Sequence, residues 1–280
     1  MATIVNQANL TYTYGTTTES VLSNPAVTER TDPIAIEKRV LDEAYRADAE
    51  LTYLLSIQNS GAAPMQNLTV TDDLGAFTPA GGGDSIVPLT YSGPAALYLD
   101  GVFSATLTPV VSETGVTFTI PEIPAGTNAL IVYQARVNGF APLETGSEIT
   151  NTVTVGDQTA SATVSVEAYA LVTVEKEMTP NPIDAGAELT VTFTIENRGN
   201  TAATDLVLVD DFPVPLTNVT VTVNGAAVTD FTFENNRLTL PASGSTQTTL
   251  TVPTATFEIG ETGAVTVVPG TLTVVLTGTI

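Results

Sequence analysis

The sequence predicts an all-β protein made of two consecutive β-sandwiches, and two local patterns support this. Short runs in which apolar and polar residues alternate recur along the chain, among them LTVTD, VTFTI, LTVTFTIEN, VTVTVNG, LTLP and LTVVLTG. Alternation with a period of two, in runs rich in Val and Thr, is typical of half-buried strands. Turn-forming Gly and Pro separate the runs at intervals of about 8–12 residues, a spacing typical of sandwiches.

An internal repeat supports two units. When the chain is shifted by 138 positions, residues 34–74 match residues 172–212 without a gap. The identities are Glu37, Lys38, Ala47, Ala49, Glu50, Leu51, Thr52, Ile57, Asn59, Gly61, Leu68, Asp72 and Asp73, which recur as Glu175, Lys176, Ala185, Ala187, Glu188, Leu189, Thr190, Ile195, Asn197, Gly199, Leu206, Asp210 and Asp211. We therefore expect two tandem immunoglobulin-like β-sandwich domains, at residues 33–170 and 171–280.

Residues 37–51, EKRVLDEAYRADAEL, are composed of good helix formers. The second copy of this stretch contains Pro180, Pro182 and Gly186, which one helix does not accommodate. We interpret both copies as strand, loop and strand, with room for one helical turn in the first.

The second unit is predicted to be incomplete. The first unit closes with a hairpin, SEITNTVTVGDQTASATVSVE, which has no counterpart in residues 171–280. A similar hairpin is predicted at residues 1–32, where IVNQANL resembles ITNTVTV of the first unit. An incomplete sandwich exposes its core and unpaired strand edges, which a neighbouring copy can fill by β-augmentation. The predicted donor strand presents Ile4, Asn6, Ala8 and Leu10.

Two arrangements follow from this hairpin. If it enters the second domain of another copy, the contact is heterologous, and the chain is its own partner in a ring or a head-to-tail homopolymer. Alternatively, the hairpin folds onto its own second domain, and the chain is a stalk module of a surface adhesin.

Charge and composition exclude several function classes. Eight basic residues face thirty acidic ones, for a net charge of −22. Such a chain cannot build the basic surface that nucleic acids or anionic membranes require, and no apolar run reaches the length of a membrane span. The absence of Cys and His excludes disulfides, thiol catalysis, Cys/His zinc sites and histidine catalysis. We expect no enzymatic activity, cofactor or metal.

Several motifs resemble the conserved-repeat family of bacterial and archaeal surface proteins. They are V-E-K near the start of a unit, E-L-T-x-x-F-T-I-E-N-x-G, a strand ending in L-x-L-x-D-D, and the late I-T-N-T-V-T-V. The resemblance covers nearly the whole chain. It implies an extracellular stalk-like protein on a cell or spore surface, in tandem arrays and without enzymatic activity.

Alternation also places three polar residues on the apolar face of the strands. In the first unit these are Lys38, Asp72 and Asn151. In the second unit they are Lys176 and Asp210, and the donor strand supplies Asn6 at the position of Asn151. Burying such groups is costly unless they meet one another.

A buried lysine, aspartate and asparagine have the chemistry to form a Lys–Asn isopeptide bond. Burial favours a neutral amine, which is a nucleophile, and a protonated acid, which polarises the asparagine carbonyl, so that ammonia leaves. The bond would be intramolecular in the first unit and would join two copies in the second. The alternatives are a hydrogen-bonded polar cluster or a lysine that extends to the surface. Asn59 and Asn197 are rival partners, but each precedes a Gly by two residues, which favours a turn role.

The paired acids Asp72-Asp73 and Asp210-Asp211 offer oxygen ligands for calcium. Because no spaced acidic loop accompanies them, we interpret them as solvated strand ends. We expect the chain to be a structural subunit of an extracellular filament.

Overall fold

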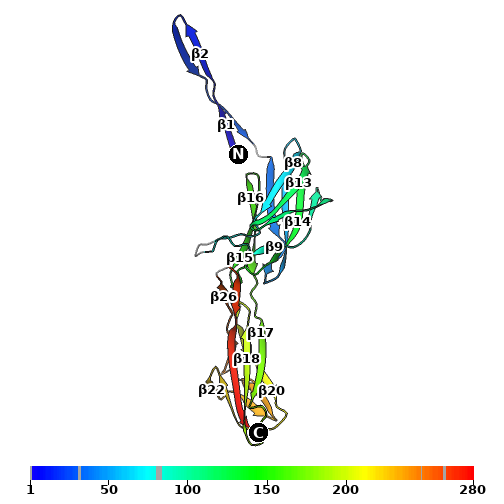
Figure 1. Cartoon of the computed structure of the whole chain (residues 1–280), viewed down its shortest axis with the longest axis vertical. Helices are drawn as coiled ribbons and strands as arrows, with labels where there is room; N and C mark the ends of the chain where they lie inside the picture. Colours follow the sequence, from blue (N-terminus) through cyan, green and yellow to red (C-terminus); the bar gives the residue numbers. More distant parts are fainter. Residues whose placement is uncertain (1, 31–32, 80–83, 247, 261–262) are drawn as a thin grey trace.

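The computed structural model describes residues 2–30, 33–79, 84–246, 248–260 and 263–280. These residues form strands and turns and no helix, which confirms the all-β prediction. No membrane-spanning helix is found in the described part of the chain. The molecule is elongated: a hairpin projects from one end, and two sandwiches follow along the axis (Figure 1).

The hairpin comprises residues 2–30 and is paired in two sections. Its strands are β1 (Ala2–Asn6), β2 (Asn9–Tyr14), β3 (Thr17–Leu22) and β4 (Ala26–Arg30), with β1 paired to β4 and β2 to β3. Gly15 forms the turn with a φ of 56°, which glycine adopts without strain. Apolar side chains such as Leu10 and Val27 are each 62% exposed. The hairpin thus carries apolar surface that its own chain does not cover.

The first sandwich buries one core between two sheets, each strand turning alternate side chains inward. One sheet has the order β11 (Val102–Leu107), β10 (Ala95–Leu99), β14 (Asn128–Val137), β7 (Glu50–Asn59), β5 (Ile34–Val40), with β9 (Leu89–Tyr91) also paired to β14. The other has the order β12 (Val110–Ser112), β13 (Gly115–Ile123), β8 (Met65–Asp72), β15 (Glu148–Val155), β16 (Gln158–Val166), β6 (Ala44–Tyr45). Residues 37–51 contain parts of β5 and β7 and the short β6, so the strand–loop–strand interpretation holds and no helical turn forms.

The second sandwich repeats this plan around its own core. Its larger sheet has the order β17 (Val172–Thr179), β18 (Glu188–Asn197), β28 (Gly270–Thr279), β21 (Thr217–Val223), β22 (Ala226–Val228). The opposite side has β20 (Leu208–Asp211), β24 (Arg237–Leu240) and β23 (Thr232–Glu234), with a separate pair of β19 (Ala203–Leu206) and β25 (Leu250–Val252). The core is mainly aliphatic, with Phe193 and Phe212 among its buried members.

The two sandwiches differ in how their sides are closed. In the first sandwich, β15 pairs with the edge of β8, and β16 pairs with β15. β16 thereby lies against β5 of the opposite sheet. Among the described residues of the second, β20 is an edge strand, and no counterpart of the β15–β16 hairpin lies beside it. The exposed β17 and the free edge of β20 are called the open side below. Here Val174 is 61% and Met178 56% exposed, whereas Ile36 and Val40, one repeat earlier, are half-buried.

A second hairpin joins the sandwiches. It consists of β26 (Thr256–Ile259) and β27 (Val265–Val268), and although it belongs to residues 171–280, Phe257 packs into the first core. The Val265 amide donates to the Gly139 carbonyl at 2.8 Å. Across the same junction, the buried Asn200 side chain donates to the carbonyls of Leu143 and Glu167, at 3.0 and 2.9 Å. The junction is therefore packed and hydrogen-bonded.

Candidate functional site

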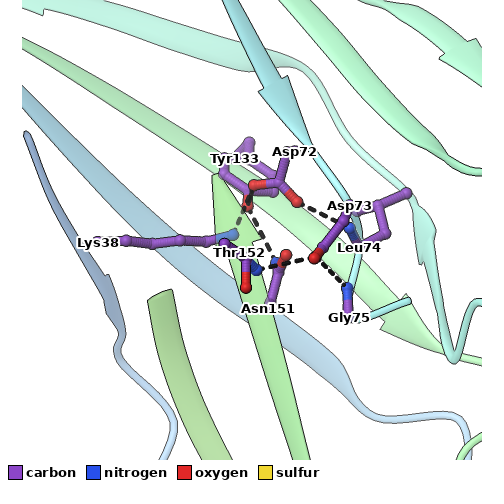
Figure 2. A network of polar contacts seen from close by, with 8 residues as sticks. All are labelled: Lys38, Asp72, Asp73, Leu74, Gly75, Tyr133, Asn151 and Thr152. Atoms are coloured by element: carbon purple, nitrogen blue, oxygen red, sulfur yellow. Dashed lines mark hydrogen bonds and ion pairs between the residues drawn. The ribbon is translucent and has the colours of Figure 1, made fainter. Parts of the chain in front are cut away.

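A charged cluster lies inside the first sandwich, and Lys38 of β5 is its cation. The Lys38 side chain is 0% exposed and its Nζ lies 2.6 Å from Oδ2 of Asp72, whose side chain is 1% exposed. Asn151 of β15 lies beside them, completely buried. Figure 2 shows the three side chains pointing toward one another from three different strands. The structure therefore brings Lys38, Asp72 and Asn151 together.

A residue that the sequence analysis did not single out lies at the centre of the cluster. The Tyr133 hydroxyl donates to Asp72 Oδ2 and accepts a hydrogen bond from Asn151 Nδ2 at 3.2 Å (Figure 2). No direct hydrogen bond between Asp72 and Asn151 is found in the described structure; Tyr133 connects them. The sequence did contain a signal for its position. In NALIVYQARV, Tyr133 lies two residues from both Ile131 and Ala135, so alternation places all three side chains on the same inward face.

Two polar atoms in this cluster lack a hydrogen bond of ordinary geometry within the described residues: Asn151 Oδ1, and the Tyr53 hydroxyl, which lies near the Asn151 side chain. The Tyr53 ring stacks on Tyr133 with centroids 5.4 Å apart, and Lys38 Nζ lies 5.1 Å from its centroid. Unpaired buried polar groups are costly and therefore rare in native proteins, and a catalytic role is one reason why they persist. The carboxamide of Asn151 is thus held at its nitrogen while its carbonyl oxygen is unpaired.

Backbone groups hold the two acids in place. The Leu74 amide donates to Asp72 Oδ1 at 3.0 Å, which leaves Oδ2 for Lys38 and Tyr133. Asp73 Oδ1 accepts from the amides of Gly75 and Thr152, both at 2.8 Å, and so ties β8 to β15. The expectation of a solvated strand end is wrong for Asp72, because the closing hairpin covers it. No group of acids able to hold a metal is found in the described residues.

Burial changes the protonation of the cluster. It lowers the pKa of Lys38 below its usual 10.5, and the attraction of Asp72 only partly opposes this. Burial also raises the pKa of Tyr133 well above its usual value, an effect that Asp72 reinforces. Lys38 is therefore closer to the neutral amine than an exposed lysine, and Tyr133 keeps its proton.

The second sandwich repeats the ion pair in a more open setting. Lys176 Nζ lies 2.6 Å from Asp210 Oδ2, but the side chains are 36% and 15% exposed. Lys176 also lies over the rings of Phe193 and Phe212, 5.5 and 5.1 Å from their centroids. No asparagine lies beside this pair among the described contacts, and the pair faces the open side.

The residues of the predicted donor strand lie away from both sites. Ile4, Asn6, Ala8 and Leu10 are exposed on the projecting hairpin, at the end of the molecule opposite the second sandwich (Figure 1). The described chain therefore does not place its hairpin on its own open side, contrary to the alternative of an intramolecular fit.

The rival asparagines have turn roles. Asn59 Oδ1 accepts from the Gly61 amide at 2.9 Å, and its Nδ2 donates to three carbonyls. Asn197 Oδ1 accepts from the Gly199 amide at 2.9 Å. Both amides are fully committed to the backbone, so neither is a free partner for a lysine.

Comparison with known proteins gives a limited match in sequence. A family model described as translocon-associated protein beta matches residues 158–214. No curated protein matches the chain. The resemblance to the conserved-repeat family therefore stays a prediction.

Solved structures that are similar to this chain include three bacterial surface proteins. The pilus backbone RrgB of Streptococcus pneumoniae is 14% identical with a TM-score of 0.34, over 84% of this chain and 55% of that one. The major pilin BcpA of Bacillus cereus is 13% identical with a TM-score of 0.34, over 94% and 77%. The collagen adhesin of S. aureus is 13% identical with a TM-score of 0.23, over 89% and 80%. The chain spans about half the length of the pneumococcal protein.

Proposed function

We propose that this chain is the structural subunit of an extracellular filament on a bacterial cell or spore surface, assembled head to tail by donor-strand complementation. One observation carries the proposal. The first sandwich is closed by a hairpin, the second has no such hairpin among its described residues, and a free hairpin projects from the other end of the molecule.

The direction of the hairpins supports this arrangement. The turn of β15–β16 points toward the end of the molecule from which the N-terminal hairpin projects (Figure 1). A donated hairpin can enter the second sandwich of another copy from the end that lies away from that copy's first sandwich. It would then run along the second sandwich in the same direction as β15–β16 runs along the first sandwich. Repeating this contact adds copies along one axis, as a heterologous interface does.

The exposed surfaces match in character. The open side presents Val174 and Met178, and the hairpin presents Ile4 and Leu10, 51% and 62% exposed. Tyr12 and Tyr14 share a face of the hairpin, since their rings stack and both hydroxyls donate to Glu19. Covering these side chains removes apolar area from water in both partners.

Register decides whether the joint becomes covalent. When the hairpins are aligned by their turns, Leu10 takes the position of Asn151, because Gly15 corresponds to Gly156. When they are aligned by the similarity of IVNQANL to ITNTVTV, Asn6 takes that position, and the turn lies four residues farther along, about 13 Å. The covalent joint needs the second register, in which Asn6 meets Lys176.

We place an isopeptide bond between Lys38 and Asn151 within each subunit, and between Lys176 and Asn6 across each joint, with Asp72 and Asp210 as the acids. Burial of Lys38 and its contact with Asp72 support the first bond. The second pair becomes equally buried only when a hairpin covers it.

Deletion of residues 1–30 tests the assembly. The shortened chain keeps both sandwiches and its open side, so it should cap filaments of the full chain but form none itself, as seen by electron microscopy. The full-length Thr11→Ala variant, altered on the opposite face of the hairpin from Leu10, serves as a control that still polymerises. Normal filaments from the shortened chain would refute donor-strand assembly.

Mass spectrometry and denaturing gels test the covalent bonds. Each bond releases one ammonia, about 17 Da. Boiled filaments should run as ladders that Lys176→Ala abolishes, whereas Lys38→Ala should keep the ladder and remove only the internal mass loss. Filaments that dissociate wholly to subunits of unmodified mass would refute the bonds and leave donor-strand assembly standing.

A further inference from the structure

Tyr133 occupies a position that the acid–lysine–asparagine chemistry alone does not explain. Its hydroxyl bridges Asp72 Oδ2 and Asn151 Nδ2, and Oδ2 is the same oxygen that binds Lys38 Nζ at 2.6 Å. The side chain is buried in a stack of aromatic rings. A hydroxyl is both a donor and an acceptor, so it can pass a proton along such a bridge.

We propose that Tyr133 is a catalytic residue of the first-domain cross-link, carrying a proton from Asp72 to the departing nitrogen of Asn151. This inference rests on the proposed Lys38–Asn151 bond and adds the step that protonates the nitrogen that leaves as ammonia. An amide nitrogen is a poor leaving group until it is protonated, and it is Nδ2 that touches the Tyr133 hydroxyl.

The protons balance as follows. Lys38 Nζ first gives one proton to Asp72 Oδ2, and the neutral amine attacks Cγ of Asn151. Because Asp72 is now protonated and Nδ2 is pyramidal in the intermediate, the two hydrogen bonds of Tyr133 reverse, so that Asp72 donates to the hydroxyl and the hydroxyl donates to Nδ2. The Asp72 proton then moves to the Tyr133 oxygen while the Tyr133 proton moves to Nδ2, and the C–N bond breaks. Asp72 takes a second proton from the former Lys38 nitrogen. The products are the Lys38–Asn151 amide, ammonia, an intact Tyr133 hydroxyl and a protonated Asp72.

The high pKa of Tyr133 is consistent with this role, because the hydroxyl stays protonated until the nitrogen becomes basic in the tetrahedral intermediate. Asn151 Oδ1, which has no partner among the described residues, is the atom that accumulates negative charge. This transfer of a proton through Tyr133, called the relay below, thus acts on the nitrogen of the carboxamide, which is the atom that the Tyr133 hydroxyl contacts.

The second domain provides an internal comparison. Tyr133 pairs with Tyr53 across β14 and β7, and the corresponding pair of β28 and β18 is Leu276 and Val191. The second site therefore has no hydroxyl at the position of the relay. Its bond, where it forms, proceeds without this residue and is expected to be slower.

The test is a time course of ammonia loss in the full chain after a short pulse of cell-free synthesis, in a Lys176→Ala background that removes the intermolecular bond. Tyr133→Phe keeps the ring and removes the hydroxyl, and we expect the first-domain mass loss to slow about 100-fold or more. Tyr91→Phe is the matched control, because its ring also stacks on Tyr133, with centroids 6.5 Å apart, but among the described contacts its hydroxyl makes no hydrogen bond to Asp72 or Asn151. It should react at the parental rate.

Two further measurements separate catalysis from structure. The melting temperatures of Lys38→Ala and Lys38→Ala/Tyr133→Phe, neither of which can cross-link, give the structural cost of the lost hydroxyl, and rates are compared at temperatures where all variants are folded. Fluorotyrosines at position 133 keep the shape but lower the phenol pKa, so the rate should change steadily along the series. If folded Tyr133→Phe loses ammonia at the parental rate, the relay is wrong and the cross-link stands. If the parental chain never loses ammonia, both are wrong.

Discussion

Leu10 lies on the hairpin face that we place against the open side, and its replacement by Asp tests this contact directly. The side chain is 62% exposed in the single chain. Burying a whole Leu contributes about 1.5–3 kcal/mol, so covering the exposed part contributes about 1–2 kcal/mol. Leu10→Asp loses this and adds an ionised carboxylate in an apolar contact, which costs roughly 2 kcal/mol or more.

The sum is at least about 3 kcal/mol, which corresponds to a rise of more than about 100-fold in the dissociation constant of each joint. The assay is the critical concentration for filament growth of chains that also carry Lys176→Ala and so cannot close the joint covalently, measured by light scattering and checked by electron microscopy. Thr11→Asp adds the same charge one residue away on the opposite face, so it should raise the critical concentration less than about fivefold, the effect of a surface charge. Equal effects from the two variants would show that this face of the hairpin does not enter an apolar site.

Three other predictions concern the first sandwich and the junction. Gly115→Ala should abolish the internal mass loss or unfold the first sandwich, because an added Cβ would lie 2.1 Å from the Asp72 carbonyl oxygen. The control is Gly126→Ala, which is also at positive φ but has no atom near the new Cβ, and it should keep the mass loss. The rate of first-domain cross-linking should fall as the pH rises, with the fall beginning below pH 10.5, because burial lowers the pKa of Lys38 and the reaction needs the proton that Lys38 gives to Asp72; a rate that rises up to the pKa of an exposed lysine would contradict this. Asn200→Ala should lower the free energy of unfolding by about 2–3 kcal/mol, because it leaves buried carbonyls at the junction unpaired. It should also raise the hydrogen-exchange rate of the Tyr169 amide, which in the parental chain donates to Asn200 Oδ1 at 2.9 Å. An unchanged exchange rate would show that the junction does not depend on this side chain.

The sequence predicted the elements that depend on local pattern. Alternation gave the inward positions of Lys38 and Asp72, and the repeat gave Lys176 and Asp210, so that both ion pairs could be expected from the chain alone. Their different burial could not, because it depends on which strands cover them.

Alternation and the internal repeat do not predict the tertiary partners of the cluster. Alternation points Tyr133 inward, but only the register of β14 beside β7 and the packing of the opposite sheet bring its hydroxyl between Asp72 and Asn151. Likewise, nothing in the local sequence of Asn200 distinguishes a residue that binds the preceding domain from one that faces solvent. Contacts of high sequence separation decide both positions.

The β26–β27 hairpin means that the boundary of the repeat is not a boundary of folding. Phe257 and Ala255 belong to the buried core of the first sandwich, although about 85 residues of the second sandwich's part of the chain precede them. During synthesis the ribosome must therefore release residues well beyond position 170 before that core is complete. A first sandwich produced alone would expose an apolar patch where Phe257 lies, and the two units should melt in one cooperative transition rather than two.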